Sequence, residues 1–352
     1  MKSKIKAEIL TPVHIGDGNE LEPLEYVIRD KFYKINLEAW LSTLTGAKLD
    51  EFRKLTGKNY GQKEALVLLR KFIRENIDTR NHTEWTADVT ENARMRYEER
   101  FEKPENQLPM SPFIRSSSKP FLPGSSIKGS IRTAYLNYLA KDIPLHKVKR
   151  ADEAEGRILD ALRLNKQGKP AGLSIEKDPF RAIKIRDTFL PEGATVFAEI
   201  INYNKKNQRL TPTNIQILSE VTYSTLMDRP VLFGTEIVID ENALKSPAIH
   251  GKHKRLSVRG LLEACDYFYN KALIEERDRL FKNVTDGNKI KEIYDRILSA
   301  SKGGFLFRVG WGSGVISMSI KQARTVRQYG NSKHLVEGLY PLGWVKLTLE
   351  DA

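Results

Sequence analysis

The sequence has very little cysteine: Cys265 is the single cysteine among 352 residues. One cysteine cannot form a disulfide framework within the chain, which excludes a disulfide-stapled secreted domain and indicates a reducing compartment. No apolar run approaches the ~18 residues of a membrane-spanning helix, so we expect no membrane segment. The first ten residues, MKSKIKAEIL, alternate apolar and charged side chains and lack the apolar core of a signal peptide. These absences together predict a cytoplasmic protein.

Negative charge is also in short supply, with 45 acidic residues against 58 lysines and arginines and a net charge of +13. This excess favours a polyanionic partner, with nucleic acid ahead of a membrane surface because no basic amphipathic helix stands out. A basic protein without such a partner is the alternative. Hydrophobic residues make up 40% of the chain, which is long enough for two packed modules.

The apolar pattern predicts an α+β fold with antiparallel sheets. Ile5, Ala7 and Ile9 alternate with charged residues, as expected for a half-buried strand, and similar strands follow between about 183 and 240. Helical patterns cover about 36–76, 258–281 and 289–299. The strands and helices lack the regular rhythm of a doubly wound sheet, and most strands have one polar face.

The segment LPGSSIKGSIRTAYLNYL contains two glycines with the separation found in a P-loop. However, Ser130 and Ile131 stand where a P-loop requires lysine and a hydroxyl residue, which excludes ATP or GTP binding here. The segment instead predicts a helix that is capped by Ser125 or Ser126, with Gly124 allowing close approach of a ligand.

Two cations, Lys128 and Arg132, follow one helical turn apart and are candidates for binding phosphate at this helix end. An ordinary capped helix with two solvated cations fits the pattern equally well.

A second glycine cluster, FRVGWGSGVIS, contains Gly310, Gly312 and Gly314 after an apolar strand. Its spacing matches neither the GxGxxG pattern of dinucleotide sites nor the GxSxG pattern of hydrolases. A loop of this kind lets an RNA backbone approach closely, and Trp311 is available for stacking on a base. A tight hairpin with a packed tryptophan is the alternative.

Four segments together resemble the RAMP superfamily of CRISPR–Cas proteins. They are LTPVHIGDGNELEPLEYVIRD, FLPGSSIKGSIRTA, DPFRAIKIRDT, and GWGSG together with PLGWVKL. PGSSIKGSIRT carries the superfamily resemblance. The opening segment and DPFR make the chain most similar to the subunit that caps the 3′ end of the crRNA in the type III-A (Csm) effector complex.

The resemblance implies two ferredoxin-like (RRM-like) RAMP modules with helical and loop insertions. The first would cover 1–210, with insertions at about 40–105 and 140–180, and the second would cover 211–352 and carry the glycine-rich loop. It also implies a non-catalytic RNA-binding subunit that holds the 3′ part of the crRNA, caps the filament of backbone subunits and supports crRNA maturation and antiviral defence. The implied partners are crRNA, the backbone RAMP subunit and the small subunit, with target RNA nearby and no cofactor.

The candidate RNA contacts combine glycine loops, hydroxyl groups, cations and one tryptophan. They are His14, Gly16, Gly18, Arg115, Ser125, Ser126, Lys128, Arg132, Arg181, Lys254, Arg255, Arg308, Gly310, Trp311, Gly312 and Gly314. Arg181 fits an ion pair with Asp178 equally well. We expect no metal site, because the histidines of HGKHKR have no second cysteine near Cys265 to complete a zinc ligand set.

Catalysis has one candidate residue, His14, because a histidine can act as general acid or base in RNA cleavage. RAMP endoribonucleases that process CRISPR repeats often use one, so a metal-independent repeat endoribonuclease is an alternative. A repeated backbone subunit is another, but Leu24 occupies the position that matches the catalytic aspartate of those subunits. We therefore expect no catalytic residue.

Overall fold

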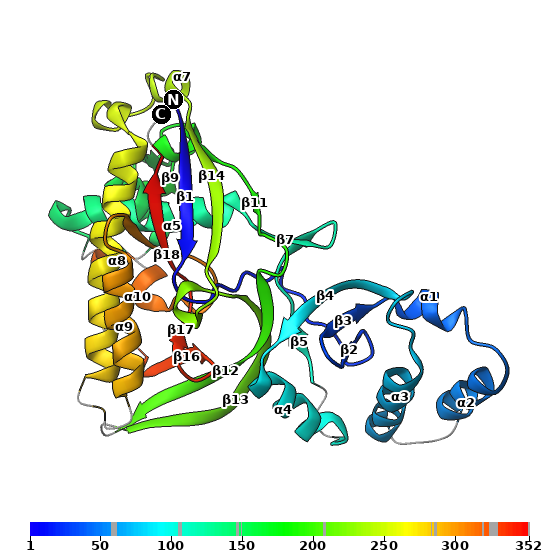
Figure 1. Cartoon of the computed structure of the whole chain (residues 1–352). Coiled ribbons are helices and arrows are strands. Elements are labelled where there is room, and N and C mark those ends of the chain that lie inside the picture. The colour runs from blue at the N-terminus through cyan, green and yellow to red at the C-terminus, as the bar shows by residue number, and fades with distance from the viewer. Residues whose placement is uncertain are drawn as a thin grey trace.

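The computed structural model describes residues 1–57, 62–104, 108–145, 148, 150–206, 209–282, 284, 287–318, 320–323 and 330–350. It confirms the predicted α+β class, with mostly antiparallel strands. Figure 1 shows a tall body, a long curved hairpin below it, and an arm that extends to one side. Within the described ranges, no helix combines the length and apolar character needed to cross a bilayer.

A five-stranded antiparallel sheet forms the upper body. Its strands, in spatial order, are β10 (Ile183–Ile185), β14 (Val231–Ile239), β1 (Lys2–Ile9), β18 (Trp344–Leu349) and β15 (Phe305–Arg308). The alternation predicted for β1 is confirmed, because Ile5, Ala7 and Ile9 are buried while Lys4 and Lys6 are exposed. The buried face packs against two helices, α5 (Gly124–Leu139) and α8 (Val258–Phe281).

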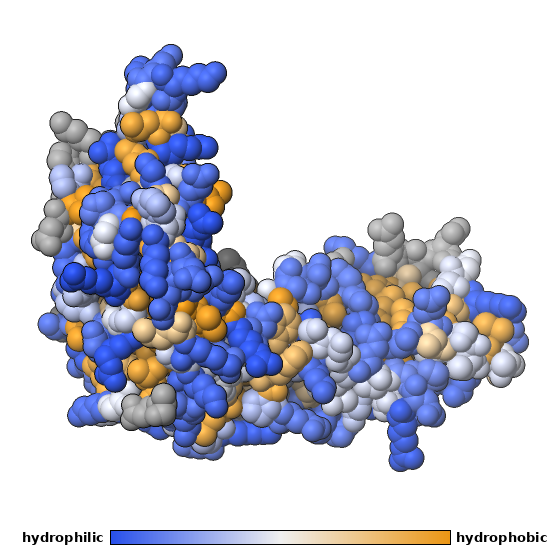
Figure 2. Space-filling view, turned by 90° about the horizontal axis from the view of Figure 1, so that it is seen from above, coloured by the Kyte–Doolittle hydropathy of each residue, from blue (hydrophilic) through white to orange (hydrophobic). Residues whose placement is uncertain are grey.

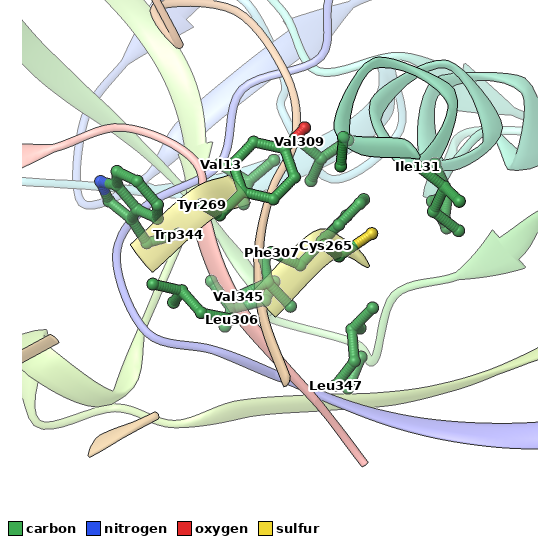
Figure 3. Packing of buried hydrophobic residues seen from close by; sticks show 14 of the residues in the cluster. Val13, Ile131, Cys265, Tyr269, Leu306, Phe307, Val309, Trp344, Val345 and Leu347 are labelled. Atoms are coloured by element: carbon green, nitrogen blue, oxygen red, sulfur yellow. The ribbon is translucent and has the colours of Figure 1, made fainter. Parts of the chain in front are cut away.

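The core between this sheet and its helices is built from large side chains (Figure 3). Tyr269 on α8 meets Phe307 and Trp344 with ring centroids 5.7 and 6.4 Å apart. Cys265 lies in the same core, where burial raises the pKa of its thiol. This buried cysteine is therefore a packing residue, in keeping with an apolar position on a core helix.

A second sheet of eight strands curves beneath the first. Its strands are β17 (Tyr340–Pro341), β16 (Ser332–Val336), β12 (Thr195–Lys206), β13 (Arg209–Thr222), β4 (Thr83–Val89), β3 (Phe32–Ile35), β2 (Tyr26–Ile28) and β5 (Met110–Ser111). The long β12–β13 hairpin has a register shift between Ile201 and Tyr203, which bends it. Two short pairings, β4 with β12 and β5 with β13, are parallel.

The arm contains most of the insertion predicted at 40–105. Its helices are α1 (Leu37–Leu41), α2 (Gly46–Gly57) and α3 (Gln62–Asn76), while α4 (Glu91–Phe101) packs against the second sheet. Trp40, Phe72 and Ile73 form a separate apolar core there. Arg29 donates hydrogen bonds to the carbonyls of Arg74 and Ile77, which fastens the end of α3 to the β2–β3 turn. Figure 2 shows this arm from above, extending from the body with a mainly hydrophilic surface.

The insertion predicted at 140–180 has more structure than its polar composition suggests. It comprises η1 (Ala140–Asp142), α6 (Ala151–Ile158), β8 (Leu162–Leu164) and β9 (Pro170–Leu173). Leu136, Ala154 and Ile158 pack together and attach this unit to the C-terminal end of α5. A few residues of both predicted insertions, among them 58–61 and 146–147, lie outside the described residues.

The remaining elements are short apart from one helix. They are β6 (Arg115–Ser116), β7 (Lys119–Leu122), β11 (Thr188–Phe189), η2 (Pro179–Ala182), η3 (Thr225–Met227), α7 (Glu241–Leu244), η4 (Gly251–Arg255), α9 (Asn288–Ala300), α10 (Val315–Met318) and η5 (Lys321–Ala323). Strands β6, β7 and β11 form a small third sheet.

The residue at which we divide the sequence, 210, lies inside β13. Both sequence segments contribute strands to both large sheets: β1 pairs with β14 and β18 in the first, and β12 pairs with β13 and β16 in the second. The division into 1–210 and 211–352 stays a prediction about the sequence, and neither segment corresponds to one whole sheet.

Candidate nucleic-acid interface

Three segments that are distant in the sequence meet around one surface groove with a volume of about 530 Å³. The loop after β1 contributes His14, Gly16 and Gly18, and the first turn of α5 contributes Ser126. The loop after β15 contributes Gly310 and Trp311. Six of the predicted contact residues therefore line the same groove.

The two glycine loops are held together by their backbones. The amide of Trp311 donates to the carbonyl of His14 at 2.8 Å. Gly310 adopts a φ of 91°, and a Cβ atom there would lie 2.5 Å from the same carbonyl oxygen. Both the left-handed backbone and the close approach require glycine, so this residue is needed to join the loops.

His14 forms part of the groove floor and is only 6% exposed. Its Nδ1 lies 2.6 Å from the carbonyl of Glu220, and since a carbonyl can only accept, Nδ1 carries the proton and Nε2 is left towards Gly16. Burial lowers the pKa of the ring, which also meets Phe113 and Trp311 edge to face. The geometry is that of a neutral, fixed histidine.

The glycine-rich loop presents its tryptophan to solvent. Trp311 is 40% exposed and its ring lies against His334, with centroids 4.8 Å apart. Gly312 and Gly314 have φ values of 77° and 75°, so the loop turns repeatedly and then enters α10. The apolar strand that precedes the glycines is β15, and it ends at Arg308, before the first left-handed glycine of the loop.

A buried network of charged side chains lies next to this loop and hydrogen-bonds to its backbone. Glu276 on α8 accepts from Arg308 at 2.9 Å, pairs with Lys333 at 2.7 Å and accepts from the hydroxyl of Tyr294. Burial alone would raise the pKa of Glu276, but the two cations outweigh it and hold the pKa at about 2. Lys333 also donates to the carbonyl of Gly312 at 3.2 Å.

The position of Arg308 in this network changes its interpretation. Its side chain is fully buried and donates to the carbonyl of Leu342 as well as to Glu276. A cation held in this way cannot reach RNA without unpairing, so we leave Arg308 out of the interface and assign it a structural role.

The two predicted cations of α5 both bind groups within the chain. Lys128 donates to the carbonyl of Ile183 at 2.7 Å, and burial lowers its pKa. Arg132 pairs with Asp178 at 2.8 Å and with Glu155 at 2.7 Å. Neither cation lines the groove.

The N-terminus of α5 also differs from the prediction. The amide of Gly124 donates to Asp187 at 2.7 Å, and neither serine caps the helix, so the expected cap was wrong. A Cβ atom on Gly124 would lie 2.1 Å from the carbonyl oxygen of Ile185. This glycine therefore allows a close approach of β10, where the sequence suggested a ligand. Ser125 is exposed beside the groove-lining Ser126.

The other predicted cations divide into one that is half-buried and three that are exposed. Arg115 makes a bidentate ion pair with the buried Glu220 and stacks 3.5 Å above the Trp85 ring, so its role is structural. Arg181 donates to the carbonyl of Glu176, and its alternative partner Asp178 pairs with Arg132 instead. Lys254 and Arg255 are exposed on η4, outside the groove.

The histidines of HGKHKR meet a single carboxylate. Asp160 lies 3.7 Å from His250 and 3.8 Å from His253, and it pairs with Lys252. Across the described ranges, no group of three or more histidine, cysteine, aspartate or glutamate side chains is placed to hold a metal ion.

Several groove residues were missed by the sequence analysis. Asn19, Glu20, Ser111 and Ser219 also line it. The strand pattern of NIQILSEVTYSTL contained a signal for this region, because Glu220 stands among buried positions and a buried carboxylate needs a cation. Its partner, Arg115, lies more than a hundred residues earlier and could not be identified from spacing.

A model of the RAMP superfamily matches residues 6–317 of the chain, so the chain belongs to the RAMP superfamily, as the sequence motifs predicted. A curated relative, the CRISPR system Cms protein Csm5 of Methanocaldococcus jannaschii, is 28% identical over 236 residues. That match covers 63% of this chain and 51% of the relative, so the chain spans about half the relative's length.

Two solved structures share the fold. One is a chain in the cryo-EM structure of a Csm–crRNA–target RNA ternary complex of a type III-A CRISPR–Cas system, with a TM-score of 0.72, 20% identity, and coverage of 99% of this chain and 100% of that one. The other is the crystal structure of T. onnurineus Csm5, with a TM-score of 0.69, 20% identity, and coverage of 97% and 99%.

Proposed function

We propose that this chain is a non-catalytic RNA-binding subunit of a type III-A CRISPR interference complex. It binds the 3′ part of the crRNA and caps the filament of backbone RAMP subunits, with the small subunit and target RNA nearby. The observation that carries the proposal is the groove in which both glycine loops and Ser126 meet. Membership of the RAMP superfamily, and likenesses to proteins named Csm5 and to a chain of a Csm–crRNA complex, support it.

The groove has the chemistry of a backbone-reading RNA site. Gly16 and Gly18 are exposed and carry no side chain, so a sugar–phosphate backbone can lie against the loop. The half-exposed indole of Trp311 offers a face on which one base stacks, without selecting its sequence. Ser126 and Asn19 supply hydrogen-bonding groups. The net charge of +13 supplies the long-range attraction that makes binding sensitive to salt.

The non-catalytic assignment rests on His14. Its Nδ1–H group donates a hydrogen bond to the carbonyl of Glu220, and burial disfavours the charged form of the ring that a general acid would need. One observation keeps the endoribonuclease alternative open to test: Glu20 lines the same groove and is a second titratable group. A repeated backbone subunit is distinguished by stoichiometry, since a cap is present once in each complex.

The deciding experiment incubates the purified chain with labelled crRNA, without and then with a divalent metal ion, and measures binding and RNA integrity separately. We expect intact RNA and binding that weakens as salt rises, and weaker binding by Trp311→Ala. Discrete cleavage that disappears in His14→Ala would overturn the assignment and make the chain a processing enzyme. The absence of RNA binding by the wild-type chain would overturn it as well.

A further inference from the structure

Two tyrosines that are far apart in the sequence form an exposed pair on the helical side of the body. Tyr138 lies on the last turn of α5 and Tyr267 on α8, with ring centroids 5.6 Å apart and planes at 89°. Their exposed fractions are 42% and 37%. The packing of α5 against α8 fixes their positions, so the pair is part of the rigid body of the fold.

Two ammonium groups lie on these rings. Nζ of Lys141 is 4.0 Å from the centroid of Tyr138 and 3.8 Å from that of Tyr267. Nζ of Lys271 is 4.0 Å from the centroid of Tyr267 and donates to its hydroxyl, and these cations lower the pKa of that phenol. Among the residues that the structure describes, neither lysine has a carboxylate partner. The cluster thus combines aromatic rings with two positive charges that no carboxylate of the described residues pairs with.

This cluster is connected to the groove by the same elements. Ser126, in the first turn of α5, lines the groove, and Tyr138, in its last turn, lies about 18 Å further along the helix axis at ~1.5 Å per residue. Helix α10, which follows the glycine-rich loop, contacts both α5 and α8. Lys321 then donates its amide to Asn137, next to Tyr138, and pairs with Glu275 on α8.

We propose that Tyr138, Tyr267, Lys141 and Lys271 form a second site for single-stranded RNA, reached by the strand after it passes the groove. A base stacks on an exposed tyrosine ring, and the displaced ammonium groups move onto the phosphates. The proposal rests on the proposed function, because it assigns a further part of the path of the same RNA.

The composition of the cluster selects RNA over a protein partner. Lysine is depleted from the centres of protein–protein interfaces, where its desolvation is unfavourable. Aromatic rings interleaved with cations are instead the usual platform for single-stranded nucleic acid. Stacking of a base on a tyrosine is a stronger interaction than an exposed contact between an ammonium group and a ring, so the exchange of partners is favourable.

The test uses the full chain and a series of labelled single-stranded RNAs of increasing length, with affinity measured by fluorescence anisotropy. The double variant Tyr138→Ala/Tyr267→Ala removes both rings, and Tyr138→Phe/Tyr267→Phe keeps them. Phe189→Ala removes another exposed aromatic, 56% exposed and outside this cluster, and serves as the matched control. Because all three positions are exposed, the variants are expected to fold, which thermal unfolding checks.

We expect the alanine pair to weaken binding of the longer RNAs by about 5- to 140-fold, as the loss of one stacked base predicts, and to leave the shortest bound RNA unaffected. The phenylalanine pair and Phe189→Ala should bind as the wild type does. If Trp311→Ala weakens binding but the alanine pair binds RNAs of every length as tightly as the wild type does, this proposal is overturned and the proposed function stands.

Two other results separate the possibilities further. A wild-type chain that binds no RNA of any length overturns the proposed function itself. If the alanine pair retains its RNA affinity but no longer assembles with the backbone subunits, the surface is a protein-docking site and the RNA proposal is wrong.

Discussion

The two glycine loops and the first turns of α5 were both predicted as RNA contacts because glycines lie next to possible RNA-contacting side chains there, yet the structure places them in different surroundings. In the groove, Gly16, Gly18 and Trp311 face solvent. On α5, Gly124 accommodates a carbonyl of the chain itself, and Arg132 pairs with two carboxylates. The difference shows that a basic residue in a sequence motif is not necessarily free to bind a ligand, because an acidic partner can come from any part of the fold.

The same contrast holds for the other arginines. Arg115 and Arg308 each face a buried glutamate, at positions 220 and 276. A buried carboxylate without a cation is strongly disfavoured, so these arginines are needed for folding before any ligand is considered. Under the proposed function, the net charge of +13 acts on RNA through other, exposed lysines and arginines.

The largest expected effect comes from the buried side of this comparison. Replacing Glu276 by Gln leaves Arg308 and Lys333 as buried cations without a counter-charge. We expect a loss of about 3–5 kcal/mol in the free energy of unfolding, measured by urea titration. The matched control is Asp295→Asn, which breaks an exposed pair with Arg277 and should cost about 0–1 kcal/mol. Equal losses in the two variants would show that the buried network contributes little.

The next effect tests the exposed side. Trp311→Ala removes the indole from the groove, and we expect crRNA affinity to fall by about 1–3 kcal/mol because one stacked base loses its partner. The variant Trp311→Phe keeps a ring and should recover part of the affinity. Stability should change less than in Glu276→Gln, since the indole is 40% exposed. Unchanged affinity in Trp311→Ala would remove the groove from the RNA path.

The third prediction concerns Arg132 and separates an effect on stability from an effect on RNA affinity. Arg132→Gln should lower stability by about 1.5–3 kcal/mol, because charged hydrogen bonds to Asp178 and Glu155 are lost. It should leave crRNA affinity and its salt dependence unchanged. The exposed Lys166→Gln, at a position outside the predicted RNA contacts, is the matched control for loss of one positive charge. A fall in affinity with a salt slope flatter by about one unit in Arg132→Gln alone would mean that this arginine contacts a phosphate, and the comparison would fail.

Comparison of the sequence predictions with the structure shows which features the sequence can and cannot predict. The alternation in β1 and the long apolar pattern of α8 were predicted because each depends on neighbours within a few residues. The cap of α5 was not, because Asp187 comes from a distant segment of the chain. Several residues that line the groove were named as candidates from the sequence, because glycines and a tryptophan in a loop can be recognised locally. That these loops lie together could not be predicted, because it depends on the pairing of β1 with β18 and of β18 with β15.

The smallest expected effect concerns His14, at the floor of the groove. Because burial lowers its pKa in the folded chain, the unfolded chain binds more protons at this residue below about pH 6.5. Its contribution to stability is therefore fully present above that pH and declines as the pH falls further. In His14→Gln this decline is absent, so urea unfolding between about pH 7 and about pH 5 should show a shallower loss of stability than in the wild type.

The pH range isolates His14 from the buried network, because Glu276 loses its contribution only as the pH falls from its unfolded value towards about 2. His334→Gln is a useful companion variant, since burial also lowers the pKa of that ring beside Trp311. If His14→Gln keeps the full pH dependence of the wild type, then His14 is not held neutral in solution. A histidine that is charged near neutral pH in the same groove as Glu20 would make the groove a possible acid–base site, and the contrast between a binding groove and a structural helix would fail.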